Sequence, residues 1–122
     1  MIRPAVISLV LSLTACAALP DATASRPTGT TVIASEYGCG GRREHLRGHT
    51  ADGYVFDWRA MTAAHRTLAF GTRLRVCYHG CVVVTVNDRG PWIMSRDLDL
   101  TCGAAAKIGL PGVGRVRMEV VK

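Results

Sequence analysis

Apolar and polar residues alternate along several short stretches of the chain, and this pattern is the clearest guide to its secondary structure. Residues 73–77 (RLRVC) and 115–120 (RVRMEV) place an apolar side chain at every second position, as half-buried strands do. Residues 30–37 are β-prone, and residues 81–86 (CVVVTV) are nearly all β-branched. We therefore predict four strands here, with the strand over 81–86 fully buried.

A turn and a short helix separate these strands. The segment His79-Gly80 predicts a tight hairpin between two of them. The Ala-rich stretch Thr101–Ile108 predicts a short helix, which Thr101 caps and which stops at Gly109 and Pro111. Many short strands, few helices and frequent turns are typical of a small closed barrel.

The first residues have the pattern of an export signal. Arg3 precedes an apolar run over residues 5–13, which is too short to span a bilayer. The run leads into LTAC at residues 13–16, which resembles the lipobox of bacterial lipoproteins, where cleavage falls before the Cys and the Cys is lipidated. We therefore expect residues 1–15 to be a lipoprotein signal peptide and Cys16 to anchor the protein on a membrane. The alternative is an ordinary signal peptide cut one or two residues later.

Length and charge limit the nature of the remaining chain. The 122 residues allow one domain, which we place at 30–122, and residues 16–29, rich in Ala, Thr, Ser and Pro, predict a flexible tether. The formal net charge is +6. A basic exported domain can bind anionic polymers such as wall glycans, lipid headgroups or nucleic acid. Because the charges are scattered rather than gathered in a tract, a soluble surface that happens to be basic explains them as well.

Four cysteines come after Cys16, and an even number in a small exported domain predicts two disulfides. They are Cys39, Cys77, Cys81 and Cys102, for which three pairings are possible. Because Cys77 and Cys81 flank the predicted turn, a local bridge is favoured, which leaves Cys39 to pair with Cys102.

Zinc binding is the competing use of Cys and His. The cysteine spacing lacks the paired C-x-x-C rhythm of zinc sites, and we expect no bound metal. His45 and His49 lie four apart in a loop, where helical spacing has no meaning, and we expect them to be solvated, with zinc binding as the alternative.

Three segments of the domain resemble one known family. Residues 62–72 read TAAHRTLAFGT, residues 86–91 read VNDRGP, and residues 99–101 read DLT before the Ala-rich helix. Together they are similar to the rare lipoprotein A family over about residues 31–121. The resemblance implies a mainly β fold, the six-stranded double-psi β-barrel with one or two short helices, which expansins share. It also implies a lytic transglycosylase that cuts peptidoglycan glycan strands lacking stem peptides, here without the sporulation-related repeat domain that many members append.

The implied reaction needs a carboxylic acid. A lytic transglycosylase protonates the oxygen between N-acetylmuramic acid and N-acetylglucosamine, and the muramic 6-hydroxyl closes onto the anomeric carbon to give a 1,6-anhydro end. One residue can act as the acid and then as the base. Asp88 is the first candidate, because it comes after the strand predicted over 81–86 and precedes the turn at Gly90-Pro91. The alternative is an aspartate that pairs with Arg89 or caps the turn.

Asp57 and His65 are the next catalytic candidates. Residues 50–57 (TADGYVFD) match the family pattern Thr-Ala-x-Gly-Glu-x-Phe-Asp, with Asp57 at its Asp and Tyr54 at its Glu. Tyrosine can donate a hydrogen bond or stack on a sugar, but it cannot replace a carboxylate near neutral pH, and Asp52 is at best a partial substitute. His65 is expected to hold the acid or a sugar hydroxyl; the alternative is a structural histidine at a short helix end.

The remaining expectations concern partners and location. Four residues are expected to contact the glycan strand, although core or edge packing is the alternative for both tryptophans: Tyr54, Trp58, Arg89 and Trp92. We expect a monomer with no cofactor and no nucleic-acid partner. The resemblance places it in the bacterial envelope, anchored through Cys16 to the outer or plasma membrane and facing the periplasm or the wall.

Two other functions stay open at this point. Tyr54 in place of the family Glu favours a non-catalytic, expansin-like lipoprotein that binds peptidoglycan glycan without cutting it, and the lack of an appended wall-binding domain points the same way. The third possibility is a structural envelope or phage-encoded lipoprotein whose barrel contacts another protein.

Overall fold

The computed structural model describes residues 28–40 and 48–122. The predicted signal peptide, Cys16, nearly all of the tether and His45 lie outside the described residues. Within them the chain forms six strands and one helix: β1 (Thr30–Tyr37), β2 (Thr62–His65), β3 (Arg73–Cys77), β4 (Cys81–Asp88), β5 (Leu98–Thr101), α1 (Cys102–Ile108) and β6 (Val113–Val121).

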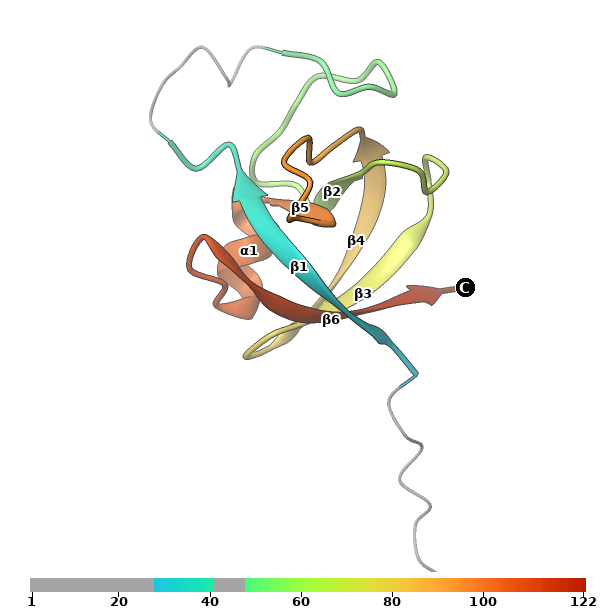
Figure 1. Cartoon of the computed structure of the whole chain (residues 1–122). Coiled ribbons are helices and arrows are strands. Elements are labelled where there is room, and N and C mark those ends of the chain that lie inside the picture. The colour runs from blue at the N-terminus through green and yellow to red at the C-terminus, as the bar shows by residue number, and fades with distance from the viewer. Residues whose placement is uncertain (1–27, 41–47) are drawn as a thin grey trace, which may run out of the picture.

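The strands close into a barrel in the order β1-β5-β2-β4-β3-β6 (Figure 1). β1 runs parallel to β5 and β2 runs parallel to β4, whereas the other neighbours are antiparallel. Neither parallel pair is consecutive in the chain, so strands that are far apart in sequence lie side by side. The predicted six-stranded barrel is confirmed.

The core fills the barrel with alternate residues of its strands. Its largest buried side chains are Leu74, Val76, Val84, Val86, Leu98, Leu100, Ile108 and Val116. The prediction that the whole stretch 81–86 is buried is wrong, because Cys81 and Val83 point outward and are exposed. In a barrel of this size only one face of each strand meets the core, and the other meets solvent or a covering segment.

The predicted hairpin and helix are both present. The Thr101 hydroxyl accepts a hydrogen bond of 3.3 Å from Ala104 N, and Gly109 ends α1 in the left-handed conformation, as the sequence signals predict. His79 N and Gly80 N in the turn between β3 and β4 both donate to Ile108 O. The turn is therefore fixed against the end of the helix.

Both predicted disulfides are present. Cys77–Cys81 closes the β3–β4 hairpin, with 4.1 Å between the Cα atoms. Cys39–Cys102 joins the segment after β1 to the first residue of α1, with 5.0 Å between the Cα atoms. The second bridge links positions 63 residues apart and so restricts the unfolded chain the more.

Two strands were not predicted from the sequence. β2 and β5 have four residues each, too few for an alternating pattern to stand out, and β2 (TAAH) contains two alanines. β6 is also longer than the predicted strand over 115–120. These short strands matter, because β2 lies between β5 and β4 and sets the position of Asp88.

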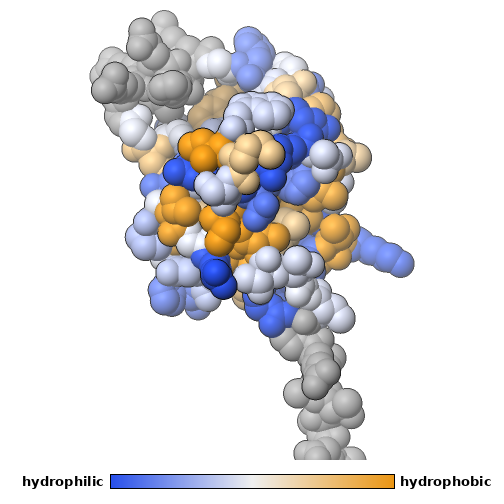
Figure 2. Space-filling view, in the orientation of Figure 1, coloured by the Kyte–Doolittle hydropathy of each residue, from blue (hydrophilic) through white to orange (hydrophobic). Residues whose placement is uncertain are grey.

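The outer surface mixes residue types. On the face shown in Figure 2, hydrophobic residues lie in several groups among hydrophilic ones. Within residues 28–40 and 48–122, no helix is both long enough and apolar enough to cross a bilayer.

Candidate active site

Asp88 ends β4, and two backbone N–H groups hold its half-buried carboxylate. Oδ1 accepts hydrogen bonds from Ala51 N at 3.0 Å and from Arg89 N at 2.9 Å. No hydrogen bond from the described residues engages Oδ2, so this oxygen can carry a proton or meet a ligand. The turn-capping role considered for Asp88 is therefore present, whereas the ion pairs of the described residues do not include one between Asp88 and the Arg89 guanidinium.

A pocket of about 200 Å³ opens beside this carboxylate. Tyr37 and Phe56 form an aromatic part of its lining, with ring centroids 5.1 Å apart. The exposed His49, expected to be solvated, also borders it. Within the described part of the chain, the lining residues are Tyr37, Gly38, Gly48, His49, Phe56 and Asp88. The pocket is thus built from the end of β1, the end of β4 and the loop between β1 and β2.

Tyr37 is a site residue that the sequence interpretation missed. Its hydroxyl is buried and has no hydrogen-bond partner within the described residues. Burial first, and then the charges of Asp88, Asp99 and Asp52, raise the pKa of Tyr37, so the hydroxyl stays protonated and can act as a donor. The available signal for Tyr37 was its position at the end of a strand, just before Gly38, because Asp88 also ends a strand.

Asp99 is a second carboxylate that the sequence interpretation left out. In the sheet, Ala64 pairs with Asp99 on one side and with Asp88 on the other, so both carboxylates belong to one row across three strands. Asp99 is held by a short hydrogen bond from the buried Ser35 hydroxyl. Ser35 thereby occupies one oxygen of Asp99, whereas Asp88 borders the pocket.

His65 is the last residue of β2, not a residue at a helix end. Its Nδ1 accepts hydrogen bonds from Thr67 N at 3.1 Å and from Leu68 N at 3.0 Å. Burial, and next the charges of Arg66 and Arg89, lower the pKa of His65, although Asp97 opposes them. The neutral imidazole therefore carries its proton on Nε2 and can donate from that atom.

Arg89 joins the end of β4 to the loop after β2. Its Nη1 donates to His65 O at 3.1 Å and to Leu68 O at 2.8 Å. Its guanidinium carbon lies 3.9 Å from the centre of the Phe70 ring. These contacts hold the loop after β2 in place. They give Arg89 a structural role, in addition to the glycan contact that we expect from it.

The segment 50–54 docks onto the end of β4. Besides the Ala51 contact, Asp52 N donates to Asn87 O at 3.2 Å. Asp52 Oδ1 accepts from the Thr50 hydroxyl and from Tyr54 N, so this carboxylate stabilises its own turn. The Tyr54 side chain is 73% exposed.

The other predicted site residues lie outside the pocket lining. Asp57 is exposed, and its Oδ1 accepts from Arg59 N at 2.9 Å, as a turn-capping aspartate does. Trp58 is 37% exposed, with the guanidinium carbon of Arg59 lying 5.1 Å from its ring centre. Trp92 is 73% exposed and comes directly after the cis Gly90-Pro91 bond, so it is not core packing.

Residues 28–40 and 48–122 contain no group of three or more His, Cys, Asp or Glu side chains that could hold a metal ion.

Comparison with known proteins gives a consistent family assignment. A family described as lytic transglycolase matches residues 30–120. Proteins named "Endolytic peptidoglycan transglycosylase RlpA" from Pseudomonas aeruginosa and Campylobacter jejuni are 42% and 40% identical over 82% and 73% of this chain. A Synechocystis protein named "Probable endolytic peptidoglycan transglycosylase RlpA" is 50% identical over 74% of the chain. The matches cover 28%, 33% and 28% of those three proteins, so the chain spans about a third or less of their length.

A solved structure supports the fold. The Streptomyces papain inhibitor superposes with a TM-score of 0.61 at 20% identity, covering 79% of this chain and 96% of that one. At this identity the likeness concerns the barrel and not its activity.

Proposed function

Because the chain belongs to the lytic transglycolase family of double-psi β-barrels, we propose that its domain cuts the glycan strands of peptidoglycan, with Asp88 as the single acid and base. The preferred substrate is glycan without stem peptides. The observation that carries this proposal is the carboxylate at the pocket, with Oδ1 held by two backbone N–H groups and Oδ2 left to carry the proton.

The reaction requires Asp88 to give one proton to the leaving sugar and to receive one from the muramic 6-hydroxyl. Asp88 donates the proton from Oδ2 to the glycosidic oxygen as the bond to the muramic anomeric carbon breaks. The muramic 6-hydroxyl attacks that carbon, and its proton passes to the Asp88 carboxylate. The products are a free hydroxyl on the leaving sugar and a 1,6-anhydro ring, and Asp88 ends in its starting state.

Other residues near Asp88 position the sugar. His65 is next in sequence to Ala64, which pairs with Asp88, and its Nε2–H donates to a sugar hydroxyl. The exposed Tyr54 and Trp92 rings stack on sugar faces: Tyr54 lies on the loop that contacts Asp88, and Trp92 follows Asp88 in the chain after the cis Gly90-Pro91 bond. Trp58, Arg89 and Asp57 are assigned supporting contacts with the glycan or with the loops that hold it.

The placement of the protein depends on its predicted anchor. We assign Cys16 to lipidation and the domain to the periplasmic or wall side of the membrane, as a monomer. β1 begins near the described start of the chain and ends at the pocket residue Tyr37 (Figure 1). A strand of this length spans roughly 23 Å, which separates the pocket from the point where the tether enters the domain.

Binding of glycan without cleavage is the second candidate. Tyr54 favours it, because this residue replaces the family's Glu on the loop that contacts Asp88, and among the described residues Asp88 is the one carboxylate in the pocket lining. An aromatic ring at that position strengthens sugar binding but supplies no second acid.

The deciding experiment is digestion of stem-peptide-free glycan, with the products identified by mass spectrometry. We expect fragments with 1,6-anhydro ends from the native protein, and a loss of roughly 100-fold or more in their rate of formation with Asp88→Asn. Asparagine still accepts from Ala51 N and Arg89 N through its amide oxygen, so the fold should be kept. Co-sedimentation with the same glycan, unchanged by Asp88→Asn and without new fragments, would establish the binding module instead.

A further inference from the structure

The outer face of β3 and β6 carries a group of arginines that the sequence does not show as a group. Leu74 and Val76 of β3 point into the core, so Arg73 and Arg75 point outward. Val116 of β6 is buried, so Arg115 and Arg117 also belong to the outer face. We call these four residues, Arg73, Arg75, Arg115 and Arg117, the basic wall.

Sheet register brings the two pairs together. β3 and β6 are antiparallel neighbours, with Arg75 opposite Glu119 and Cys77 opposite Arg117. From Arg73 to Arg115 the basic wall spans six residue steps, which is about 20 Å at the rise of a strand. Four guanidinium groups therefore share one side of the barrel.

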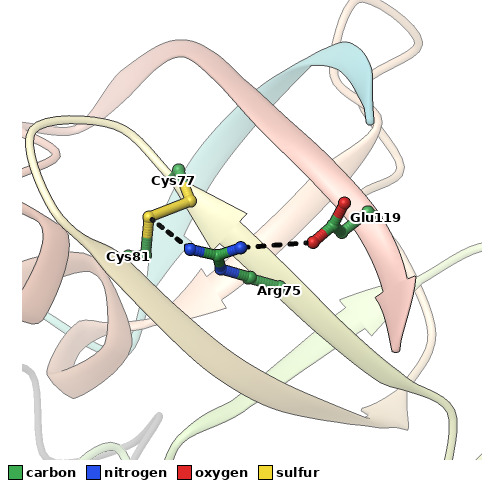
Figure 3. The surroundings of a disulfide bond; sticks show 4 residues. All are labelled: Arg75, Cys77, Cys81 and Glu119. Carbon is green, nitrogen blue, oxygen red and sulfur yellow. Dashed lines mark hydrogen bonds and ion pairs between the residues drawn. A yellow bond between two sulfur atoms is a disulfide. The ribbon is translucent and has the colours of Figure 1, made fainter. Parts of the chain in front are cut away.

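Little negative charge offsets this side. Among the described outward positions of β3 and β6, Glu119 is the one carboxylate. Glu119 Oε1 lies 3.5 Å from Nη1 of Arg75, whose Nη2 lies 4.0 Å from the Cys81 sulfur (Figure 3). Within the described residues, the side chains of Arg73 and Arg115 make no hydrogen bond or ion pair. The basic wall thus has a net charge of about +3 when Glu119 is included.

We propose that the basic wall docks on the anionic phospholipid headgroups of a membrane surface. A row of arginines along the outside of a barrel suits many interchangeable phosphates better than one bound ligand. The chain also enters the domain here, because Thr31 of β1 pairs with Arg117. A domain tethered through its N-terminal side would present this wall to the membrane, while Tyr37 at the other end of β1 borders the pocket. The proposal does not depend on glycan cleavage.

Binding to vesicles tests the proposal. The full chain carrying Cys16→Ser, which cannot be lipidated, is titrated with pure phosphatidylcholine vesicles and with vesicles containing phosphatidylglycerol. We expect at least tenfold tighter binding to the anionic vesicles, lost in high salt. In the same background, Arg73→Glu with Arg115→Glu should weaken binding to anionic vesicles at least 25-fold.

A matched control separates the wall from overall charge. Arg59→Glu with Lys107→Glu changes the charge equally on exposed residues that belong to neither β3 nor β6, and should weaken binding less than threefold. If the glutamates unfold the domain, Arg73→Gln with Arg115→Gln is compared with Arg59→Gln with Lys107→Gln, which changes the charge by the same amount. An equal loss of affinity for anionic vesicles in the wall variant and in the control variant would overturn the proposal. Equal binding of the unsubstituted wall to both vesicle types would overturn it as well. Loss of binding to intact peptidoglycan in the wall variant, without any vesicle preference, would assign the wall to a polymer instead.

Discussion

The backbone N–H of Ala51 donates a hydrogen bond of 3.0 Å to Oδ1 of Asp88, across 37 positions of sequence. Together with Arg89 N it engages a single oxygen of the carboxylate. The orientation of the candidate acid therefore depends on a loop that precedes β2, and not on β4 alone.

Ala51→Pro should slow glycan cleavage roughly tenfold and leave the fold intact. Gly53 N donates to Thr50 O, so Ala51 is the second residue of a four-residue turn, where proline is well accepted. Proline has no N–H, and the Asp88 carboxylate would lose one of its two orienting hydrogen bonds. The measurement is the rate at which 1,6-anhydro ends form.

Ala51→Gly is the matched control, because glycine keeps the N–H group. We expect its rate to stay within about twofold of the native rate, since only a methyl group is removed. Equal rates for the proline and glycine variants would show that this hydrogen bond does not orient the acid.

Asp57→Asn separates two roles for Asp57. Asparagine can still accept from Arg59 N, so a residue that only caps the turn should tolerate the change with less than about 0.5 kcal/mol of lost stability. Because Asp57 lies outside the pocket lining, we expect anhydro-end formation to persist. A loss comparable to that of Asp88→Asn would instead establish Asp57 as a required carboxylate.

His65 should make stability depend on pH. Burial and the charges of Arg66 and Arg89 lower its pKa below the ordinary value of 6.5 in the folded protein, so the unfolded chain binds the proton more readily. The contribution is complete above about pH 6.5 and is lost as the pH falls through the lowered folded pKa. Urea unfolding between pH 5 and pH 8 should show the decline.

His65→Asn should remove this part of the pH dependence, because an amide oxygen can accept from Thr67 N and Leu68 N without titrating in this range. Thr67→Ala is the control, since the donor at that position is the backbone and the slope should persist. If the free energy of unfolding of the asparagine variant still declined with falling pH as in the native protein, His65 would not be the group responsible.

The two disulfides should differ in their effect on stability. Replacing both Cys39 and Cys102 by serine should lower the free energy of unfolding by about 4 kcal/mol, because the bridge spans 63 positions. The same change at Cys77 and Cys81, which are 4 positions apart, should cost about 2 kcal/mol. Denaturant unfolding of the two double variants gives the comparison. A larger loss of stability on removal of the hairpin bridge would contradict the prediction that the bridge closing the longer loop stabilises the protein more.

Part of the candidate active site could be predicted from the sequence. Asp88 follows the β-branched run over residues 81–86, and the family resemblance of the VNDRGP segment implied the carboxylic acid for which it was the first candidate. Tyr37 also ends a strand, but its place beside the pocket depends on barrel closure, which brings Tyr37 and Asp88 to one cavity from distant parts of the sequence. Arg89 and Asp57 carried family expectations, whereas their hydrogen bonds show loop-fixing contacts that only the packed loops reveal.

By itself, the sequence determined the elements whose cause is local: alternation in β3 and β6, the Thr101 cap and Gly109 stop of α1, and the close pair Cys77 and Cys81. The tertiary structure decided which faces meet. The register between the antiparallel strands β3 and β6 places arginines that are scattered in the sequence on one face, the basic wall. The docking of residues 50–54 sets the orientation of Asp88. The physical reason is that a closed barrel fixes neighbours by strand order and register, and both depend on contacts between residues far apart in the chain.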